Sequence, residues 1–201
     1  MAQKKRKPKK NDMETLALFL SEAGLLKQIK RSGWWVVGVK DPESVAEHSF
    51  RCAVLAFVLA LAADADPYKV MTMALFNDIH ETRIGDLHKM AQRYVKIEEA
   101  EEAAFYEQID RLPPRIKKEL TRLRREYVRQ ETPESIIARD ADILECILQA
   151  KEYDEQGYAC AKKFMQKAPR FLKSVPAKRL FSTIKNTHLN TWWEQLTRFA
   201  R

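Results

Sequence analysis

The segment from Leu75 to Asp86, LFNDIHETRIGD, gathers acidic, amide and imidazole side chains directly after the apolar run KVMTMA. On a helical wheel, Asn77, Asp78 and Glu81 fall within about 100° of one another and share their sector with apolar residues. A charge buried without a partner is so costly that proteins give it a counter-charge or a metal. The placement therefore favours a functional site over a simply exposed helix end.

Two further segments place an imidazole or an acid on an apolar helix. His48 lies in the opening turns of a predicted helix, before the portion that is apolar on all sides. In the run Arg139-Asp140-Ala141-Asp142, periodicity directs Asp140 toward an apolar stripe and Asp142 toward the opposite side. Each residue alone has a structural explanation, as a core histidine or a turn cap. Three such clusters on separate helices are harder to explain in that way, although the residues alone leave both explanations open.

The elements that must position these residues are predicted to be helices, which makes the fold class all-α. Apolar periodicity and start signals predict helices over residues 13–30, 41–64, 95–112 and 132–153, with three shorter ones after Gly157. Another helix opens at Asp66-Pro67 and runs into the segment Leu75 to Asp86, and a basic helix follows Pro113-Pro114 with an apolar stripe at Ile116, Leu120, Leu123 and Tyr127. The helix that begins at Asp41-Pro42 is apolar all round from Cys52, so we expect it to be central and buried on every side. The run SGWWVVGVK interrupts the pattern and suggests an extended loop or a very short strand.

The charge distribution separates a tail from a body. The chain of 201 residues carries a net charge of +8, and residues 1–10 hold six lysines and arginines, which leaves +2 for the remainder. We predict a basic, disordered tail over residues 1–12 and a single helical domain over residues 13–201. A basic tail is usually solvated, but it also allows contact with RNA, DNA or anionic lipid and resembles a nuclear-import patch. A basic helical face could bind nucleic acid as well. That face consists of Lys117, Lys118, Arg122, Arg125 and Arg129.

Cysteine usage and hydropathy bear on the compartment. Cys52, Cys146 and Cys160 lack CxxC spacing and fall in predicted helical segments, which indicates packing roles in a reducing compartment. The longest apolar run, Ala53 to Ala63, has 11 residues, fewer than the roughly 20 that a membrane-spanning helix needs. The basic start leads into an acidic amphipathic segment, so no cleavable secretory signal is predicted. We expect a cytoplasmic protein with no membrane association.

Three motifs together resemble the HD-domain metal-dependent phosphohydrolases, and within them the small branch that contains the 5′-deoxynucleotidases. These are PESVAEHS at Pro42 to Ser49, ALFNDIHETRIGD at Ala74 to Asp86 and DADILECILQAKEY at Asp140 to Tyr153. They follow the order of the family, and the resemblance covers residues 16–158. It implies an HD-domain-like helical bundle in which two histidines and two aspartates hold one divalent metal ion.

The resemblance assigns the metal ligands residue by residue. It places the first ligand at His48, the aspartate of the HD pair at Asp78 and the final aspartate at Asp142. Periodicity alone favours Asp140 as the buried acid, and the motif selects Asp142 instead. The histidine of the HD pair falls on Asn77, and there this chain departs from the family pattern.

The resemblance also implies roles for residues around the metal. Asp86 would position or deprotonate the attacking water, and Glu81 would serve either as a hydrogen-bonding partner of the ligands or as a proton carrier. Arg31 and Trp34, in the sequence RSGW, match an arginine suited to a phosphate and a tryptophan suited to a sugar or base. A surface role for Arg31 and a core role for Trp34 are the alternatives.

The asparagine affects which metal we expect. Its neutral carbonyl oxygen is a weaker ligand than imidazole for transition metals, so Mg²⁺ or Mn²⁺ would be less penalised than Co²⁺, Ni²⁺ or Zn²⁺. We expect one divalent ion, Mn²⁺, Mg²⁺ or Co²⁺. His80, about 60° further around the wheel, is an alternative ligand, and water filling the gap is another.

The leading hypothesis from the sequence is a metal-dependent phosphohydrolase acting on nucleoside 5′-monophosphates or similar small phosphate esters. A second hypothesis keeps the fold and loses turnover: a nucleotide-sensing or interaction protein whose site lost a ligand at Asn77. A third makes the chain a basic helical nucleic-acid binder. The resemblance and the apolar Trp192-Trp193 end also indicate a homodimer.

Overall fold

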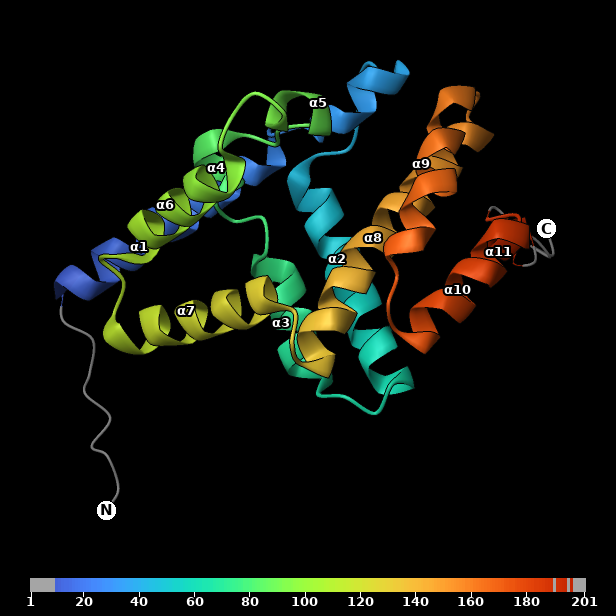
Figure 1. Cartoon of the computed structure of the whole chain (residues 1–201). Coiled ribbons are helices and arrows are strands. Elements are labelled where there is room, and N and C mark those ends of the chain that lie inside the picture. Colours follow the sequence, from blue (N-terminus) through green and yellow to red (C-terminus); the bar gives the residue numbers. More distant parts are fainter. Residues whose placement is uncertain (1–9, 190, 195, 197–201) are drawn as a thin grey trace, which may run out of the picture.

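The computed structural model describes residues 10–189, 191–194 and 196, in which helices form all the regular structure (Figure 1). The α-helices are α1 Lys10–Ala23, α2 Val45–Ala62, α3 Pro67–Phe76, α4 Glu81–Ile84, α5 Lys89–Gln92, α6 Ile97–Ile109, α7 Pro114–Arg129, α8 Pro133–Glu155, α9 Lys162–Lys167, α10 Val175–Asn186 and α11 Thr191–Glu194. The 3-10 helices are η1 Gly24–Lys27, η2 Ser32–Val37, η3 Ala159–Ala161 and η4 Ala168–Phe171. Within this described part of the chain the only β pairing is one antiparallel bridge between Lys30 and Ser44. The predicted all-α fold class is confirmed.

Side-chain caps start the central helices, at the predicted residues in α3 and α8 and three residues after the predicted Asp41 in α2. Ser44 caps α2 in a capping box with Glu47, whose carboxylate accepts from the Ser44 amide. Asp66 caps α3, with Pro67 in the first turn, and Thr132 caps α8. Each cap satisfies amide groups that have no partner inside the helix, which fixes where the helix begins. These starts set the positions of the site residues on α2 and α8.

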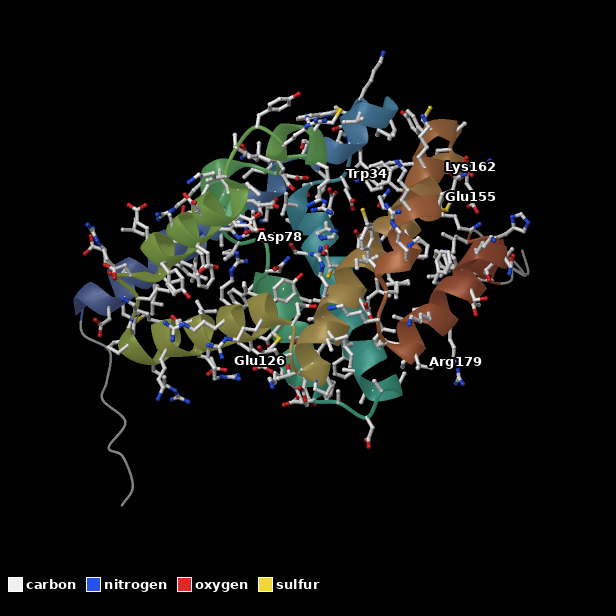
Figure 2. The ribbon with its side chains drawn as sticks, in the orientation of Figure 1. Trp34, Asp78, Glu126, Glu155, Lys162 and Arg179 are labelled. Carbon is white, nitrogen blue, oxygen red and sulfur yellow. The ribbon has the colours of Figure 1, made fainter. Side chains whose placement is uncertain are left out.

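The helices α2, α3 and α8 lie at the centre, with α1, α4, α6 and α7 on one side and α9, α10 and α11 on the other (Figure 1). One apolar cluster joins α2, α3, α7, α8 and α10 through residues such as Leu59, Met73 and Leu144. A second cluster joins α1, η1 and the start of α2 to α6 and α7 through Phe105 and Ile109. Figure 2 shows the Asp78 side chain in the interior, whereas Arg179 projects outward from α10.

The outer face of α2 corrects the prediction that this helix is buried on every side. Phe50, Val54, Val58 and Leu61 follow one another along one face and are 49–70% exposed. The neighbours α3 and α8 cover only the opposite face, which carries Ala56 and Ala60 in contact with the core. By length and composition α2 would also suit a membrane span, but 44% of it is buried within the fold. We interpret it as a core helix with one apolar outer face.

Two further boundaries differ from the predictions. The run SGWWVVGVK forms the 3-10 helix η2 and not an extended loop or strand. This helix ends at Gly38, whose φ of 91° is one that side-chain-bearing residues rarely adopt. Residues 1–9 of the predicted tail lie outside the described residues, but α1 begins at Lys10, so residues 10–12 are helical.

The segment Leu75 to Asp86 is broken and not one continuous helix. The helix α3 ends at Phe76, residues 77–80 turn, and α4 occupies only Glu81–Ile84 before Gly85, whose φ is 73°, ends it. Because of this break, Asp78 and Asp86 come from irregular backbone on either side of α4. Both can then approach the same basic side chain, Arg31.

Candidate active site

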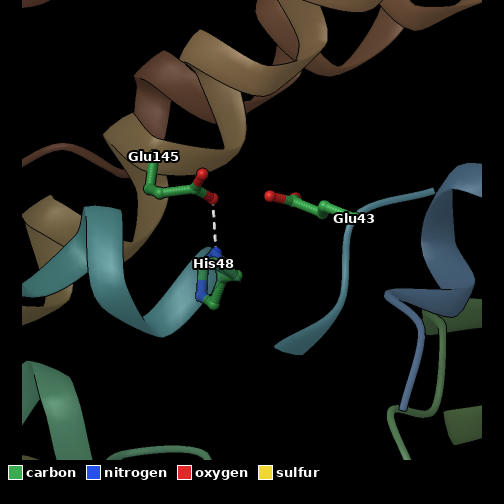
Figure 3. Close-up of side chains that lie close together, drawn as sticks. All are labelled: Glu43, His48 and Glu145. Atoms are coloured by element: carbon green, nitrogen blue, oxygen red, sulfur yellow. Dashed lines mark hydrogen bonds and ion pairs between the residues drawn. The ribbon is translucent and has the colours of Figure 1, made fainter. Parts of the chain in front are cut away.

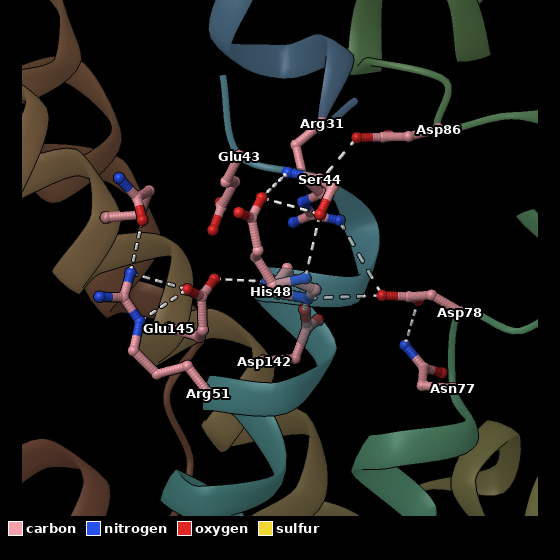
Figure 4. A network of polar contacts seen from close by, with 12 residues as sticks. Arg31, Glu43, Ser44, His48, Arg51, Asn77, Asp78, Asp86, Asp142 and Glu145 are labelled. Atoms are coloured by element: carbon pink, nitrogen blue, oxygen red, sulfur yellow. Dashed lines mark hydrogen bonds and ion pairs between the residues drawn. The ribbon is translucent and has the colours of Figure 1, made fainter. Parts of the chain in front are cut away.

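His48 lies at the centre of the polar cluster that the sequence motifs predicted (Figure 4). Its side chain is 1% exposed, and it projects from α2 toward α8 and the turn between α3 and α4. The ring nitrogen Nε2 lies 3.2 Å from Oδ1 of Asp142 and 3.4 Å from Oδ2 of Asp78. Three residues that are far apart in the sequence thus meet around one nitrogen atom.

The spacing of these donors suits a metal ion. Ligands that share one small divalent ion at about 2.0–2.2 Å stand about 3.0–3.5 Å from one another. The two distances between His48 Nε2 and the carboxylate oxygens fall in this interval. An imidazole nitrogen with two carboxylate oxygens is also a common donor set for such ions. The residues present therefore fit a divalent cation at this point.

The electrostatics of the cluster also favour a positive charge there. Burial and the nearby Arg31 charge act to lower the pKa of His48, but contacts with Asp142, Asp78 and Glu145 outweigh them and raise it well above its usual value. Burial acts to raise the pKa of Asp142, and the contact with His48 together with the Arg139 charge outweighs it and lowers that pKa. The acid is therefore ionised and ready to accept a cation.

Asn77 lies beside Asp78 and touches it directly. Its amide Nδ2 donates to Oδ1 of Asp78 at 2.7 Å, so the amide contacts the Asp78 oxygen that does not face His48. The backbone carbonyl of Asn77 accepts from Arg124, which is itself buried and also pairs with Glu102. Asn77 is thus fixed at the edge of the cluster, and it supplies no imidazole.

His80 does not join the cluster in this structure. Its side chain is buried, and Nε2 lies 3.9 Å from Glu101 on α6. Its other ring nitrogen has no hydrogen-bond partner among the described residues. The alternative in which His80 replaces the missing ligand is therefore not supported by its position.

On its other side, His48 faces two glutamates (Figure 3). Nδ1 of His48 contacts Oε2 of Glu145 directly, and Glu43 brings a carboxylate near both, so that ligand atoms of the three residues lie within 4.8 Å of one another. Each glutamate already has another donor, because Arg51 pairs with Glu145 and the indole N–H of Trp34 donates to Glu43. Burial and the Glu145 charge raise the pKa of Glu43 to about 7. A cation would fit on the Nε2 side, because one oxygen of Asp78 and one of Asp142 face that nitrogen while their other oxygens accept from Asn77 and Arg139.

Arg31 connects the cluster to Asp86. The guanidinium lies 4.0 Å from Asp78 and 3.8 Å from Asp86, and the backbone N–H of Ser32 donates to Asp86 at 2.9 Å. Burial raises the pKa of Asp86, Arg31 opposes that rise, and the Asp78 charge adds to it. This arrangement brings a guanidinium and a carboxylate next to the proposed cation position.

Glu81 is the most isolated acid of the group. Its Oε2 atom is buried and has no hydrogen-bond partner among the described residues. Burial, followed by the charges of Asp78 and Asp86, raises its pKa well above the usual value. Both effects favour the neutral carboxyl form of Glu81 over the carboxylate, and a proton donor needs the neutral form.

Trp34 lies in the environment that its alternative core role predicted. Its side chain is 2% exposed and packs against Tyr153 and Phe164, with ring centroids 5.1 Å and 4.7 Å away. A ring enclosed in this way offers no free face for stacking on a base. Its packing against Tyr153 and Phe164 and its bond to Glu43 give Trp34 a structural place.

The two aspartates of the DAD motif separate into distinct positions. Asp140 is 0% exposed and accepts from the backbone amides of Lys173 at 2.9 Å and Ser174 at 2.7 Å, which attaches α8 to the start of α10. Asp142 faces His48, and its second oxygen accepts from Arg139 at 3.0 Å. The periodicity correctly marked Asp140 as buried, and the motif correctly selected Asp142 as the acid beside His48.

Several residues of the cluster were not predicted as site residues. Glu145, Glu43 and Arg51 surround the Nδ1 side of His48 (Figure 4). The sequence does contain a signal for Glu145, which follows Asp142 by three residues in DADILE and so lies on the same side of a helix. Arg51 follows His48 at the same spacing on α2.

The basic face of α7 lies apart from this cluster. Lys117 pairs with Asp110, and Arg122 pairs with Glu119 and Glu126, so acids of the same region neutralise part of the charge. Lys118, Arg125 and Arg129, together with Lys117 and Arg122, line one open hollow of about 940 Å³ along α7. The hollow shares no lining residue with the cluster around His48.

The fold and the cluster together define the class of this protein. A family model described as HD domain matches residues 23–180. The chain therefore belongs to the HD-domain family, which confirms the resemblance inferred from the three motifs.

Particular relatives place the chain more closely. It is 36% identical over 146 residues to the 5′-deoxynucleotidase HDDC2 of Homo sapiens, covering 70% of this chain and 69% of the relative. It is 34% identical over 147 residues to the 5′-deoxynucleotidase HDDC2 of Dictyostelium discoideum, covering 69% of this chain and 77% of the relative. A solved structure, a conserved hypothetical protein from Pyrococcus furiosus, is 30% identical with a TM-score of 0.73 and covers 85% of this chain and 99% of that one.

Proposed function

We propose that this chain is a metal-dependent phosphohydrolase that removes phosphate from nucleoside 5′-monophosphates or similar small phosphate esters. The observation that carries the proposal is the meeting of His48 Nε2 with Asp78 and Asp142 at 3.4 Å and 3.2 Å in an HD-domain fold. Relatives named 5′-deoxynucleotidase support the substrate class.

In this proposal His48, Asp78 and Asp142 hold one divalent ion, with Asn77 at the fourth position of the motif. When bound, such an ion neutralises phosphoryl oxygens and acidifies water. Mn²⁺, Mg²⁺ and Co²⁺ are the candidates, and the harder Mg²⁺ and Mn²⁺ suit the amide oxygen of Asn77 best.

The other residues of the cluster would act on the substrate and its protons. Arg31, with its guanidinium near both Asp78 and Asp86, would bind phosphate oxygens. Asp86, held by the Ser32 amide, would orient the attacking water and take its proton. Glu81, whose pKa is raised by burial, would donate a proton to the leaving oxygen. Trp34 would support this site from behind by holding Glu43.

The test is phosphate release from a panel of ribo- and deoxyribonucleoside 5′-monophosphates, each with Mn²⁺, Mg²⁺ or Co²⁺. We expect release from at least one nucleotide, with the His48→Ala variant at background. Absence of release above the His48→Ala control with every nucleotide and ion would refute the enzymatic proposal.

Asn77 supports one second candidate, a nucleotide-sensing or interaction protein with the same fold. The family pattern has two histidines, and this chain offers one imidazole at the cluster. A chain that binds a nucleotide without releasing phosphate, and that gains hydrolysis on Asn77→His, would favour this candidate. Nucleic-acid binding is the less supported reading, since part of the α7 charge is already paired, and it would require binding that survives deletion of residues 1–10.

We also propose a cytoplasmic homodimer. The row formed by Phe50, Val54, Val58 and Leu61 on α2 presents four large apolar side chains in succession on the surface. A contiguous exposed apolar face of this kind is typical of a protein–protein interface. The Trp192-Trp193 end, on which the sequence prediction rested, has an exposed Trp192, whereas the Trp193 side chain lies outside the described residues.

A further inference from the structure

Glu145 is a completely buried acid that the proposed reaction does not use. It lies on α8 one turn after Asp142 and is 0% exposed. One of its oxygens contacts Nδ1 of His48, and the other lies 3.0 Å from Nε and 2.8 Å from Nη2 of Arg51. The carboxylate therefore joins an imidazole on α2 to a guanidinium on the same helix.

Arg51 is itself held firmly. Its Nη1 donates to Glu152 at 2.6 Å and its Nη2 donates to Gln149 at 2.7 Å, both on α8. A carboxylate buried without a counter-charge would be very unfavourable, and Arg51 supplies that charge. Glu145 thus stays an acceptor with a fixed direction, which leaves Nδ1 of His48 as its donor.

The consequence concerns the opposite ring nitrogen. When Nδ1 carries the proton and donates it to a carboxylate, Nε2 keeps its lone pair and points away from the carboxylate. A carboxylate partner also makes a metal-binding imidazole a stronger donor and prevents the ring from rotating. In this chain Nε2 points toward Asp78 and Asp142.

We propose that Glu145 is a positioning residue that fixes His48 for cation binding and compensates for the missing second imidazole at Asn77. The inference rests on the proposed metal site. With one imidazole in place of two, the cluster depends more strongly on the orientation and donor strength of His48. Loss of Glu145 should therefore weaken the site more in this chain than in a version with both histidines.

The test is a double-mutant cycle on Mn²⁺ binding, measured by calorimetry without substrate. Its members are the wild type, Glu145→Gln, Asn77→His and the double variant. We expect Glu145→Gln to weaken Mn²⁺ binding about 10- to 100-fold in the wild-type background, and by a clearly smaller factor in the Asn77→His background. The control is Glu152→Gln, which removes another partner of Arg51 two turns along α8. Because this pair is partly exposed, the change should alter affinity by less than about threefold.

A spectroscopic signature separates positioning from general loss of structure. In the Co²⁺-loaded wild type, proton NMR should show a hyperfine-shifted, exchangeable signal from the Nδ1–H of His48, and Glu145→Gln should lose it through exchange with water. If Glu145→Gln fails to fold, Arg51→Gln replaces it and should weaken Mn²⁺ binding and broaden the same signal.

Two outcomes would overturn the inference and are distinguishable. If Glu145→Gln binds Mn²⁺ as tightly as the wild type, or weakens it equally in both backgrounds, Glu145 does not compensate for Asn77, while wild-type hydrolysis leaves the proposed function standing. If the wild type binds no divalent ion, the metal site and this inference fall together.

Discussion

Asn77 shows how one side chain changes what a site is expected to do. Its amide touches Asp78, and its backbone is held by Arg124, so the position is well ordered without an imidazole. We predict that Asn77→His tightens Co²⁺ binding by on the order of tenfold, because imidazole is a better ligand for transition metals than an amide oxygen. Mg²⁺ affinity should change much less. Calorimetric titrations with both ions measure the difference, and an unchanged Co²⁺ affinity would show that residue 77 does not face the ion.

At this scale the sequence predicted the types of the central residues but not their hydrogen bonds. The motifs singled out His48, Asp78 and Asp142, and the structure brings all three together. The contact of Glu145 with His48 was not predicted, because a sequence does not show which ring nitrogen of a histidine faces which acid. The sequence left Trp34 with two roles, since a tryptophan near a site is compatible both with stacking on a ligand and with packing in the core, and its 2% exposure shows the second.

At the scale of helices, the connection between α8 and α10 depends on Asp140. Its carboxylate accepts from two backbone amides, those of Lys173 and Ser174, and is completely buried. We predict that Asp140→Ala lowers the free energy of unfolding by about 3 kcal/mol, because two amides would lose a charged partner in the interior. Urea denaturation measures this loss. Asp142→Ala, at the more accessible cluster, should cost clearly less stability in the metal-free protein, and the reverse order would contradict the assignment of the two aspartates.

The contact between α1 and α4 should depend on pH. Glu22 on α1 accepts from Nη2 of Arg83 on α4 at 3.1 Å and from Nε of the same residue. Hydrogen bonding to Arg83 outweighs the effect of burial and lowers the pKa of Glu22 in the folded state. An acid with a lowered pKa stabilises the fold above its unfolded pKa of about 4.5, and this contribution is lost as the pH falls through the folded value.

We therefore expect Glu22→Gln to reduce the stability lost between pH 5 and pH 3. The pair is partly exposed, so the effect should be about 0.5–1 kcal/mol. Unfolding at several pH values compares the variant with the wild type, and Glu107→Gln, at a largely exposed partner of Arg83, is the matched control. Parallel stability curves for wild type and Glu22→Gln would contradict the assignment.

Local sequence signals predicted most of the helices, whereas tertiary packing decided the exceptions. Ser44, Asp66 and Thr132 cap helices near the predicted starts because capping depends on neighbouring residues alone. The 3-10 helix η2 depends on Trp34 packing against Tyr153, which is far away in the sequence. A local sequence pattern does not predict a contact between residues so far apart in the chain. The break at residues 77–80 could not be predicted from local patterns for the same reason.

At the scale of the whole molecule, the apolar outer face of α2 is the main surface left to explain. A homodimer that buries this face should become monomeric when a charge is placed in its centre, since an unpaired charge in an apolar interface is unfavourable. We predict that light scattering shows the Val58→Glu variant as a monomer. Its melting temperature should equal that of the wild type under conditions in which the wild type is also monomeric. Tyr94→Glu, at a position that is 82% exposed on another part of the surface, should leave the dimer intact. A Val58→Glu variant that remains dimeric would place the interface elsewhere.

The whole fold brings the site together at the meeting point of α2, α8 and the turn that follows α3. None of these elements alone carries a complete set of donors, so the central claim is that one ion binds where they meet and that hydrolysis depends on it. The most direct measurement is phosphate release from a nucleoside 5′-monophosphate by metal-free protein titrated with Mn²⁺, alongside the Asp142→Asn variant. We predict that activity rises to a plateau at about one ion per chain and that Asp142→Asn stays at background. Equal activity of wild type and Asp142→Asn, or activity that does not depend on the ion, would contradict it.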